Sequence, residues 1–345
     1  MQASIVAPIV RQRYAIGGVA PVVRFLAGER ISGGLRAADE DALFAALPAA
    51  EPERIEIDGV GAFALHRNHR PGRLSGKIVV VTGSAQGFGE GIAAELLKQG
   101  CYLAYVDLNE ELARRNAEDA NRAYGRGTAI AVRCDVGDEA SVSAMIDATV
   151  AAFGGLDLFV SNAGILFSGG LEEMDLARFE LVTKVNYVGY FLCAKYAARV
   201  MKLQRRFNPA ATADIVQVNS KSGLEGSNKN FAYAGGKFGG IGLTQSFAKE
   251  LVEHGVKVNA VCPGNYFEGP LWMDPDKGLF VQYLKAGKAP GARTTEDVKR
   301  FYEAKVPMNR GCFPVDVARA ILYCVEQAYE TGQAIPVTGG QNMLK

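Results

Sequence analysis

Apolar runs separated by helix-length polar stretches dominate the chain from Lys77 onward. The run Ile78–Val81 is continuous and β-branched, as expected for a strand covered by helices on both faces. Strands that alternate with helices are typical of an α/β fold, here a doubly wound Rossmann-type parallel sheet with helices on both faces. The predicted strands are 78–81, 102–106, 129–132, 156–160, 215–218 and 256–261, with a last short one around Val337.

The first 72 residues show a different pattern and end at a break near Pro71-Gly72. Residues 39–46 predict a short helix with an acidic first turn, and residues 54–65 predict two short strands around Asp58-Gly59. The segment has too little apolar pattern to stand alone. We therefore predict an N-terminal extension of unknown role over residues 1–72, a small appendage to one domain over 73–345.

Composition excludes several classes of protein. The chain has 345 residues, 48% of them hydrophobic, with 38 basic against 37 acidic side chains. This near-neutral balance argues against a nucleic-acid partner, and no apolar run approaches the roughly 18 residues that a membrane span requires. The N-terminus does not have the pattern of a secretory signal, so the expected location is cytoplasmic.

Cysteine and histidine spacing gives no metal-binding pattern. The six cysteines are scattered and contain no CxxC pair, which indicates reduced, buried thiols. Two of the three histidines, His66 and His69, lie in a short basic run. A solvated linker explains that run better than a metal site, so no metal is predicted.

Glycine makes up 40 of the 345 residues, about 12% against a usual value of about 7%. A glycine-rich turn directly follows the first predicted strand of the sheet. Such a turn brings backbone N–H groups to a pyrophosphate at a helix N-terminus, although a tight turn alone can also require glycine. The predicted cofactor contacts in this turn are Gly83, Ser84, Gln86, Gly87, Phe88 and Gly89.

Polar or small residues also follow the next strands of the sheet. Asp107 ends the second strand, where a carboxylate binds ribose hydroxyls and repels a 2′-phosphate, so NAD is favoured over NADP; a simple turn aspartate is the alternative. After the third strand, Asp135 and Val136 are placed to meet the adenine. After the fourth, small residues would let the ribose lie close to the backbone; these are Asn162, Ala163 and Gly164.

Tyr233 and Lys237 lie four residues apart, on one face of a predicted helix. A bare pair at this spacing is usually a surface pair. Here Ser220 precedes Tyr233 by thirteen residues, just after a buried strand, and Asn186 lies in the preceding helix. Ser222 is a competing serine whose offset fits less well.

In this order and spacing the motifs resemble those of the short-chain dehydrogenase/reductase family, over about residues 73–345. The resemblance implies that Tyr233 is the catalytic acid/base, that Ser220 polarises the substrate oxygen, and that Lys237 binds the nicotinamide ribose and lowers the pKa of Tyr233. Asn186 would hold a water in a proton relay. Pro263 and Gly264 would lie beside the cofactor, but Glu268 replaces a threonine that is usual in the family.

A narrower resemblance, to sorbitol-6-phosphate 2-dehydrogenases, lies in the segments 218–223, 236–246 and 338–341. A phosphorylated polyol needs cations at the far end of its pocket, although exposed lysines are ordinary in loops. The candidate substrate contacts are Lys221, Lys229, Arg310 and Asn219, with Glu225 and Asn230 as further readers of sugar hydroxyls. Residues 265–304 form an insertion that would act as a lid, its aromatic residues packing it down or closing over the substrate.

The expected function is NAD-dependent interconversion of a secondary alcohol and a ketone, best matched by a hexitol 6-phosphate and a ketose 6-phosphate. An unphosphorylated polyol or another hydroxy compound is the enzymatic alternative. An NAD-binding regulator with little turnover and an assembly component that uses the extension are alternatives of other classes. Family resemblance also implies a homo-oligomer, a dimer or tetramer.

Overall fold

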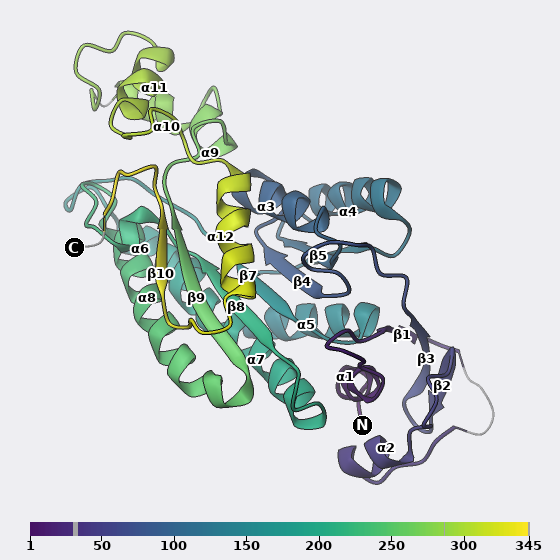
Figure 1. Ribbon diagram of the computed structural model, residues 1–345. Coiled ribbons are helices and arrows are strands. Elements are labelled where there is room, and N and C mark those ends of the chain that lie inside the picture. Colours follow the sequence, from purple (N-terminus) through teal and green to yellow (C-terminus); the bar gives the residue numbers. More distant parts are fainter. Residues whose placement is uncertain (30–33, 286, 344–345) are drawn as a thin grey trace.

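A seven-stranded parallel sheet forms the centre of the molecule (Figure 1). The computed structural model of the protein describes residues 1–29, 34–285 and 287–343. The strand order is β10-β9-β8-β7-β4-β5-β6, so the predicted doubly wound Rossmann-type fold is confirmed. The strands are β4 (Ile78–Thr82), β5 (Tyr102–Asp107), β6 (Ala129–Arg133), β7 (Leu158–Ser161), β8 (Ala213–Val218), β9 (Val256–Pro263) and β10 (Ala334–Val337).

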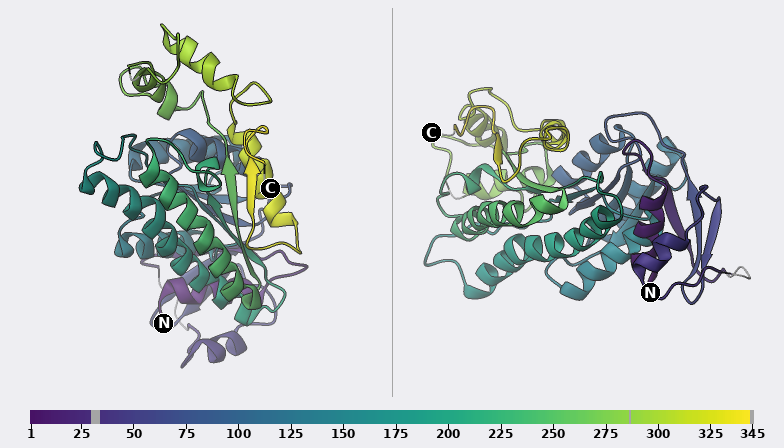
Figure 2. Two further views of the ribbon diagram at one scale, coloured as in Figure 1. Left: turned by 90° about the vertical axis from the view of Figure 1, so that its left-hand side faces the viewer. Right: turned by 60° about the horizontal axis from the view of Figure 1, so that its bottom comes forward.

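Helices cover both faces of this sheet (Figure 2). One face carries α3 (Gly87–Leu97), α4 (Glu110–Tyr124) and α12 (Pro314–Glu326), and the other carries α5 (Glu139–Phe153), α7 (Gly189–Phe207) and α8 (Phe231–Leu251). Every side chain of β4 is buried, because the strand lies in the middle of the sheet between the two layers. The apolar runs in the sequence therefore form the core. Among the described residues, no helix is both long and apolar enough to cross a membrane.

A helical lid follows β9 at the carboxyl ends of the strands, seen at the top of Figure 1. It contains α9 (Pro270–Met273), α10 (Leu279–Lys285) and α11 (Thr295–Glu303). Its aromatic residues pack mainly on one another, with Trp272 in the centre, 4.9 Å from the ring of Phe267 and 5.0 Å from that of Phe280. The lid thus has a small core of its own.

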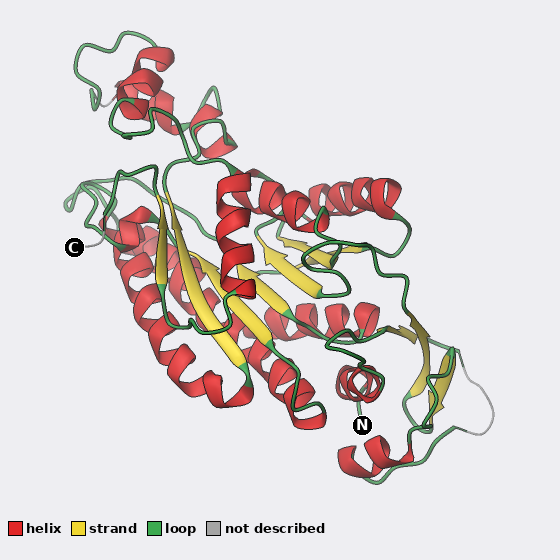
Figure 3. Ribbon diagram, in the orientation of Figure 1, coloured by secondary structure: helices red, strands yellow, loops and turns green. Residues whose placement is uncertain are grey.

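The N-terminal residues form α1 (Ala3–Arg13), α2 (Glu40–Ala46) and a three-stranded antiparallel sheet in the order β1-β3-β2. The predicted short helix and hairpin are confirmed as α2 and the pair β2 (Arg54–Ile57) and β3 (Gly61–His66). The helix α1 and the strand β1 (Val22–Leu26) were not predicted. Figure 3 shows these elements at the edge of the molecule, away from the lid.

The N-terminal elements share the core of the larger sheet. Val6, Ile9 and Val10 of α1 are fully buried in the same cluster as side chains of α5 and α7. Arg11 is also buried and donates to both carboxylate oxygens of Asp157, at 3.0 and 2.8 Å. This ion pair therefore ties the first helix of the chain to the residue that precedes β7.

The basic run around His66 is not a solvated linker, and that prediction was wrong. His66 and His69 are half-buried and each lies edge-on to Tyr102, whose hydroxyl donates to the backbone oxygen of Asn68 at 2.6 Å. Burial lowers the pKa of both imidazoles. The run fixes the path of the chain into β4.

Candidate active site

Four predicted catalytic residues come together at the carboxyl ends of β7 and β8. Ser220 follows β8 directly, while Tyr233 and Lys237 lie one turn apart on α8. The Lys237 ammonium lies 5.5 Å from the centre of the Tyr233 ring. Asn186 lies in a π-helical turn, η1 (Lys184–Val188), and a side chain at Gly236 on α8 would meet its Cβ at 3.6 Å. Residues far apart in sequence thus form one cluster.

Burial dominates the electrostatics of this cluster. It raises the pKa of Tyr233, which a hydrogen bond from the Ser220 side chain partly counteracts. Burial also lowers the pKa of Lys237 to about 8, and the ammonium donates to the backbone oxygen of Val218 at 2.8 Å. Burial thus shifts the pKa values of Tyr233 and Lys237 in opposite directions, with the ammonium lying beside the phenol ring.

The side chain of Asn186 holds the loop that follows β7. Its amide oxygen accepts from the N–H of Ile165 at 2.8 Å, and its amide nitrogen donates to the Ile165 oxygen at 2.9 Å. Asn186 is 3% exposed, so both side-chain groups are used within the protein. π-Helical turns are frequent at functional sites because they shift a residue out of the regular helix pattern.

Asn219 is not a substrate contact, and this prediction is corrected. The residue is 2% exposed. Its amide donates to the Gln217 side chain at 2.7 Å and to the Lys237 backbone oxygen at 2.9 Å, and its oxygen accepts from the Ser220 N–H at 2.8 Å. Asn219 therefore positions Ser220 relative to α8.

The glycine-rich turn is built by close backbone approach. Gly83 has φ +64°, and a Cβ there would lie 2.8 Å from the Cα of Ala163; one at Gly89 would lie 2.0 Å from the Gly83 oxygen. The Asn162 amide donates to the backbone oxygens of Thr82 and Gly83 at 2.9 and 3.1 Å. The turn after β4 and the Asn-Ala-Gly turn after β7 therefore form one rigid unit. Only glycine fits two of its positions.

Asp107 and Ser84 also take part in this unit. The Asp107 carboxylate accepts from the N–H groups of Ala85 and Asn109, both at 3.0 Å. Ser84 is fully buried, and its N–H and hydroxyl both bond the backbone of Val106. The Ser84 side chain thus joins the turn to β5, and its predicted contact with a cofactor is corrected to this supporting role.

The remaining predicted cofactor residues lie along the same edge of the sheet. Asp135 accepts from the Gly137 N–H at 2.9 Å, and Val136 is buried behind it. Gly264, after Pro263, donates its N–H to the Val337 oxygen at 2.9 Å. Gln86 precedes the first turn of α3 as its N-cap residue.

Residues of the lid lie over the glycine-rich turn, which the sequence did not indicate. The ring of Tyr266 stacks on Phe88 at 5.0 Å between centroids, and a Cβ at Gly87 would lie 3.7 Å from Pro270. Glu268, at the usual threonine position, pairs with Lys299 of α11 at 3.1 Å. The segment that carries Glu268 is thus held by a contact within the lid.

The charged residues that were predicted to bind the substrate differ in their contacts within the protein. Arg310 makes two hydrogen bonds to Asp316, at 2.6 and 3.1 Å, which form an ion pair at the start of α12, and its role as a phosphate contact stays a prediction. Lys229 is exposed and lies 3.8 Å from Glu173. Lys221 lies in η2 (Lys221–Gly223), next to Ser220.

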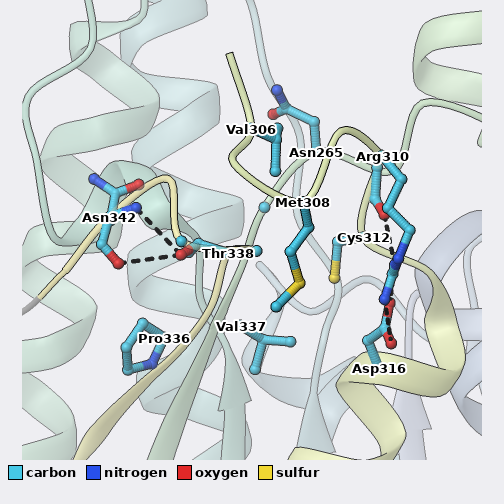
Figure 4. A pocket seen from close by; sticks show the side chains of 14 residues that line it. Asn265, Val306, Met308, Arg310, Cys312, Asp316, Pro336, Val337, Thr338 and Asn342 are labelled. Atoms are coloured by element: carbon cyan, nitrogen blue, oxygen red, sulfur yellow. Dashed lines mark hydrogen bonds and ion pairs between the residues drawn. The ribbon is translucent and has the colours of Figure 1, made fainter. Parts of the chain in front are cut away.

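A cavity of about 430 Å³ lies between the lid exit and the end of β10 (Figure 4). It reaches Gly264 but does not contain Ser220, Tyr233 or Lys237. The cavity therefore adjoins the predicted cofactor edge rather than the cluster of Ser220, Tyr233 and Lys237. Its labelled lining residues are Asn265, Val306, Met308, Arg310, Cys312, Asp316, Pro336, Val337, Thr338 and Asn342.

Known proteins are similar to this chain in both sequence and fold. Residues 77–273 match the short chain dehydrogenase family. The sorbitol-6-phosphate 2-dehydrogenase of Escherichia coli is 36% identical over 271 residues, which is 78% of this chain and 99% of that protein. The crystal structure of the sorbitol-6-phosphate 2-dehydrogenase from Erwinia amylovora superimposes with a TM-score of 0.70 at 37% identity, covering 78% of this chain and all of that one.

A third relative acts on a different compound. The 2-(S)-hydroxypropyl-CoM dehydrogenase 3 of Xanthobacter autotrophicus is 32% identical over 274 residues, which is 79% of this chain and 99% of that protein. The family match begins at residue 77, after the N-terminal extension. The chain belongs to the short-chain dehydrogenase family and is an oxidoreductase that acts on an alcohol or ketone.

Proposed function

We propose that the enzyme is NAD-dependent and oxidises the secondary alcohol of a polyol phosphate to a ketone, with sorbitol 6-phosphate and fructose 6-phosphate as the pair. The observation that carries this proposal is the likeness, across nearly the whole sheet domain, to two sorbitol-6-phosphate 2-dehydrogenases. The cluster of Ser220, Tyr233 and Lys237 supplies the proton chemistry that such a reaction needs. A regulator without turnover has no need of that cluster.

The edge of the sheet fits a dinucleotide. Gly83 and Gly89 leave room where a Cβ would strike backbone, and Gly87 opens the turn toward the lid. This cradle would hold the pyrophosphate, with Asp107 at the ribose and Asp135 near the adenine. No basic residue accompanies Asp107 in the sequence, which favours NAD over NADP.

Proton transfer is assigned to Tyr233. NAD, when bound, supplies the hydride acceptor. The Tyr233 phenolate takes the proton of the substrate hydroxyl, and the Ser220 hydroxyl donates a hydrogen bond to the same oxygen as it becomes a carbonyl. A free phenol has a pKa of about 10, so the Lys237 ammonium is needed to favour the phenolate. Asn186 holds the loop after β7 through its two bonds to Ile165.

An unphosphorylated polyol or another hydroxy compound is the second candidate. This candidate is supported by the similarity to 2-(S)-hydroxypropyl-CoM dehydrogenase 3, whose identity to this chain, 32%, is close to the 36% of the sorbitol-6-phosphate 2-dehydrogenase. We further propose that the enzyme works in the cytoplasm as a homo-oligomer. Apolar side chains exposed along α6 (Leu176–Thr183), η1, α7 and α8 support an oligomer; they are Leu176, Phe179, Val188, Phe191 and Phe238.

A substrate panel tests the proposal. Reduction of NAD and of NADP is followed with polyols and polyol phosphates, and we expect kcat/KM to be highest with NAD and sorbitol 6-phosphate. Tyr233→Phe should abolish turnover yet leave NADH binding, read by NADH fluorescence, nearly intact. Turnover with NADP alone would refute the role given to Asp107. Equal rates for sorbitol and sorbitol 6-phosphate would refute the proposal that the substrate is phosphorylated.

A further inference from the structure

The glycine-rich turn is held by a side chain of α4 that lies outside the sequence motifs. The side-chain amide of Asn116 donates to the backbone oxygen of Ser84 at 3.2 Å and to that of Ala85 at 3.0 Å. Asn116 is half-buried and lies on the same side of α4 as the buried residues Ala113 and Ala120. One amide on the inner side of this helix therefore fixes two consecutive peptide groups of the turn.

These two bonds set the direction in which the N–H groups of the turn point. In a planar trans peptide the C=O and the N–H point to opposite sides. The Ser84 carbonyl faces Asn116, and the N–H of the same peptide, that of Ala85, donates to the Asp107 carboxylate at 3.0 Å. The Ala85 carbonyl also faces Asn116, so the Gln86 N–H points away from α4. None of the described residues accepts a hydrogen bond from the Gln86 N–H.

The Gln86 N–H adjoins the N-terminus of α3. Gln86 is the N-cap residue of that helix, and its side chain makes no capping bond. The first N–H groups of a helix have no partner within the helix, and in a turn of this kind they bind the pyrophosphate of a dinucleotide. The peptide between Ala85 and Gln86 contributes one more donor to this group, and the bond from Asn116 fixes its direction.

We propose that Asn116 is a positioning residue for the cofactor, which holds the peptide between Ala85 and Gln86 so that the Gln86 N–H is directed at the pyrophosphate. The inference rests on the proposed dinucleotide site and adds a residue of α4 to it. NAD and NADP share the pyrophosphate, so the role is the same for either. Without Asn116 the turn would be ordered only on binding, at a cost in affinity.

This role predicts an effect on binding rather than on the chemical step. The pyrophosphate is not changed by hydride transfer, so contacts to it act equally on the ground state and the transition state. Loss of Asn116 should therefore raise the KM for the cofactor and leave kcat at saturating cofactor nearly unchanged.

Asn121 provides a matched control on the same helix. Its side-chain amide donates to the Ala129 backbone oxygen at 2.8 Å, and its side-chain oxygen accepts from the Ala129 N–H at 3.0 Å. Asn116 and Asn121 thus each make two hydrogen bonds to the backbone, but Asn121 bonds the start of β6 instead of the glycine-rich turn. Substitution by leucine removes both bonds in either case and keeps a side chain of similar size.

The test compares full-length Asn116→Leu and Asn121→Leu with the wild type. Fluorescence titration gives the Kd of NADH and of NADPH, and competition gives the Ki of ADP and of adenosine, which lacks phosphate. We expect Asn116→Leu to raise the Kd of the dinucleotide and the Ki of ADP about 10-fold or more, and the Ki of adenosine less than about 3-fold. Asn121→Leu should change each value less than about 2-fold, although urea unfolding should show that both variants are destabilised.

Failure of this inference can be told apart from failure of the proposed function. A wild type that binds NADPH but not NADH would refute NAD as the cofactor, and the effect of Asn116→Leu is then read with NADPH. A wild type that binds neither would refute both proposals. An unchanged Ki of ADP in folded Asn116→Leu, an equal loss for adenosine, or an equal loss in Asn121→Leu would overturn the role of Asn116.

Asn116→Asp tests the same contact in a variant that keeps the shape of the side chain. The aspartate has no N–H to donate, and its carboxylate would face the backbone oxygens of Ser84 and Ala85. We expect it to raise the Ki of ADP at least as much as Asn116→Leu does. A wild-type Ki of ADP in this variant would show that the amide donor is not required.

Discussion

Asn219 shows how a buried amide can set the relative positions of Ser220 and Lys237 through contacts within the protein. It is bonded to the Ser220 N–H, to the Lys237 backbone oxygen and to the Gln217 side chain. These three contacts connect the end of β8 to the first turns of α8. The relative placement of the serine and the tyrosine helix thus depends on one side chain.

Asn219→Ala tests this positioning role. Loss of the amide leaves buried polar groups unpaired, at a cost of about 1–3 kcal/mol each, and lets Ser220 shift. We expect kcat to fall at least 10-fold, while NADH affinity by fluorescence titration stays within about 2-fold of the wild type. An unchanged kcat in a folded variant would show that the serine is held by other contacts.

Side-chain spacing predicted that Ser220, Tyr233 and Lys237 lie close together, but not the contacts of their neighbours. Ser220, Tyr233 and Lys237 follow from motif order, because their offsets reflect one strand end and one helix face. Asn219 and Arg310 could not be assigned in this way. Whether a polar side chain faces the substrate or a protein partner depends on contacts with Gln217 or Asp316 that only the fold brings about.

At the scale of elements, α8 packs against β8 through a helical glycine. A Cβ at Gly240 would lie 2.4 Å from the side-chain nitrogen of Gln217, which is buried and bonded to Asn219. Gln217 therefore cannot move aside freely. A Cβ added at Gly242 would have no neighbouring atom within 4 Å.

Gly240→Ala is expected to destabilise the protein by about 1–3 kcal/mol through overpacking, and to lower kcat because the displaced Gln217 pulls on Asn219. Gly242→Ala is the matched control and should stabilise the helix by about 1 kcal/mol, since alanine has the higher helix propensity. Urea unfolding followed by circular dichroism gives both values. Equal effects of the two substitutions would rule out close packing at Gly240.

The elements of the sheet were predictable, whereas α1 was not. Each strand of the sheet is an apolar run of a few residues, so a short window of the sequence is enough to predict it. The helix α1 contains Pro8, which weakens any local helix signal, and it is stabilised by packing on α5 and α7. Its stability thus depends on tertiary contacts that no window of the local sequence contains.

At the scale of the whole molecule, the Arg11–Asp157 pair fastens the N-terminal extension to the sheet domain. The Asp157 carboxylate also accepts from the Ile78 N–H at 2.7 Å. Burial alone would raise the pKa of Asp157, but the Arg11 guanidinium, helped by Lys77, holds it below its usual value. A carboxyl group with a lowered pKa adds stability above about pH 4, and this contribution is lost as the pH falls further.

Arg11→Met should lower the free energy of unfolding at pH 7 by about 3–5 kcal/mol, because it leaves a buried carboxylate without its partner. The deficit should shrink between pH 7 and pH 5, since the isolated carboxyl group takes up a proton. Arg36→Met removes an exposed pair with Asp58 and should cost about 1 kcal/mol or less. A deficit that does not change with pH would mean that Arg11 acts through packing alone.

The position of α1 also sets the order in which the chain can fold during synthesis. The Gln12 side chain bonds Asn208, 196 residues later in the chain. At about 5–20 residues per second, roughly 10–40 seconds pass before the ribosome has made that partner. Until α5 and α7 have both been made, Val6, Ile9 and Val10 lack the helices that bury them. The N-terminal extension is therefore synthesised well before the helices it packs on, and its apolar side chains stay without their native partners until those helices have been made.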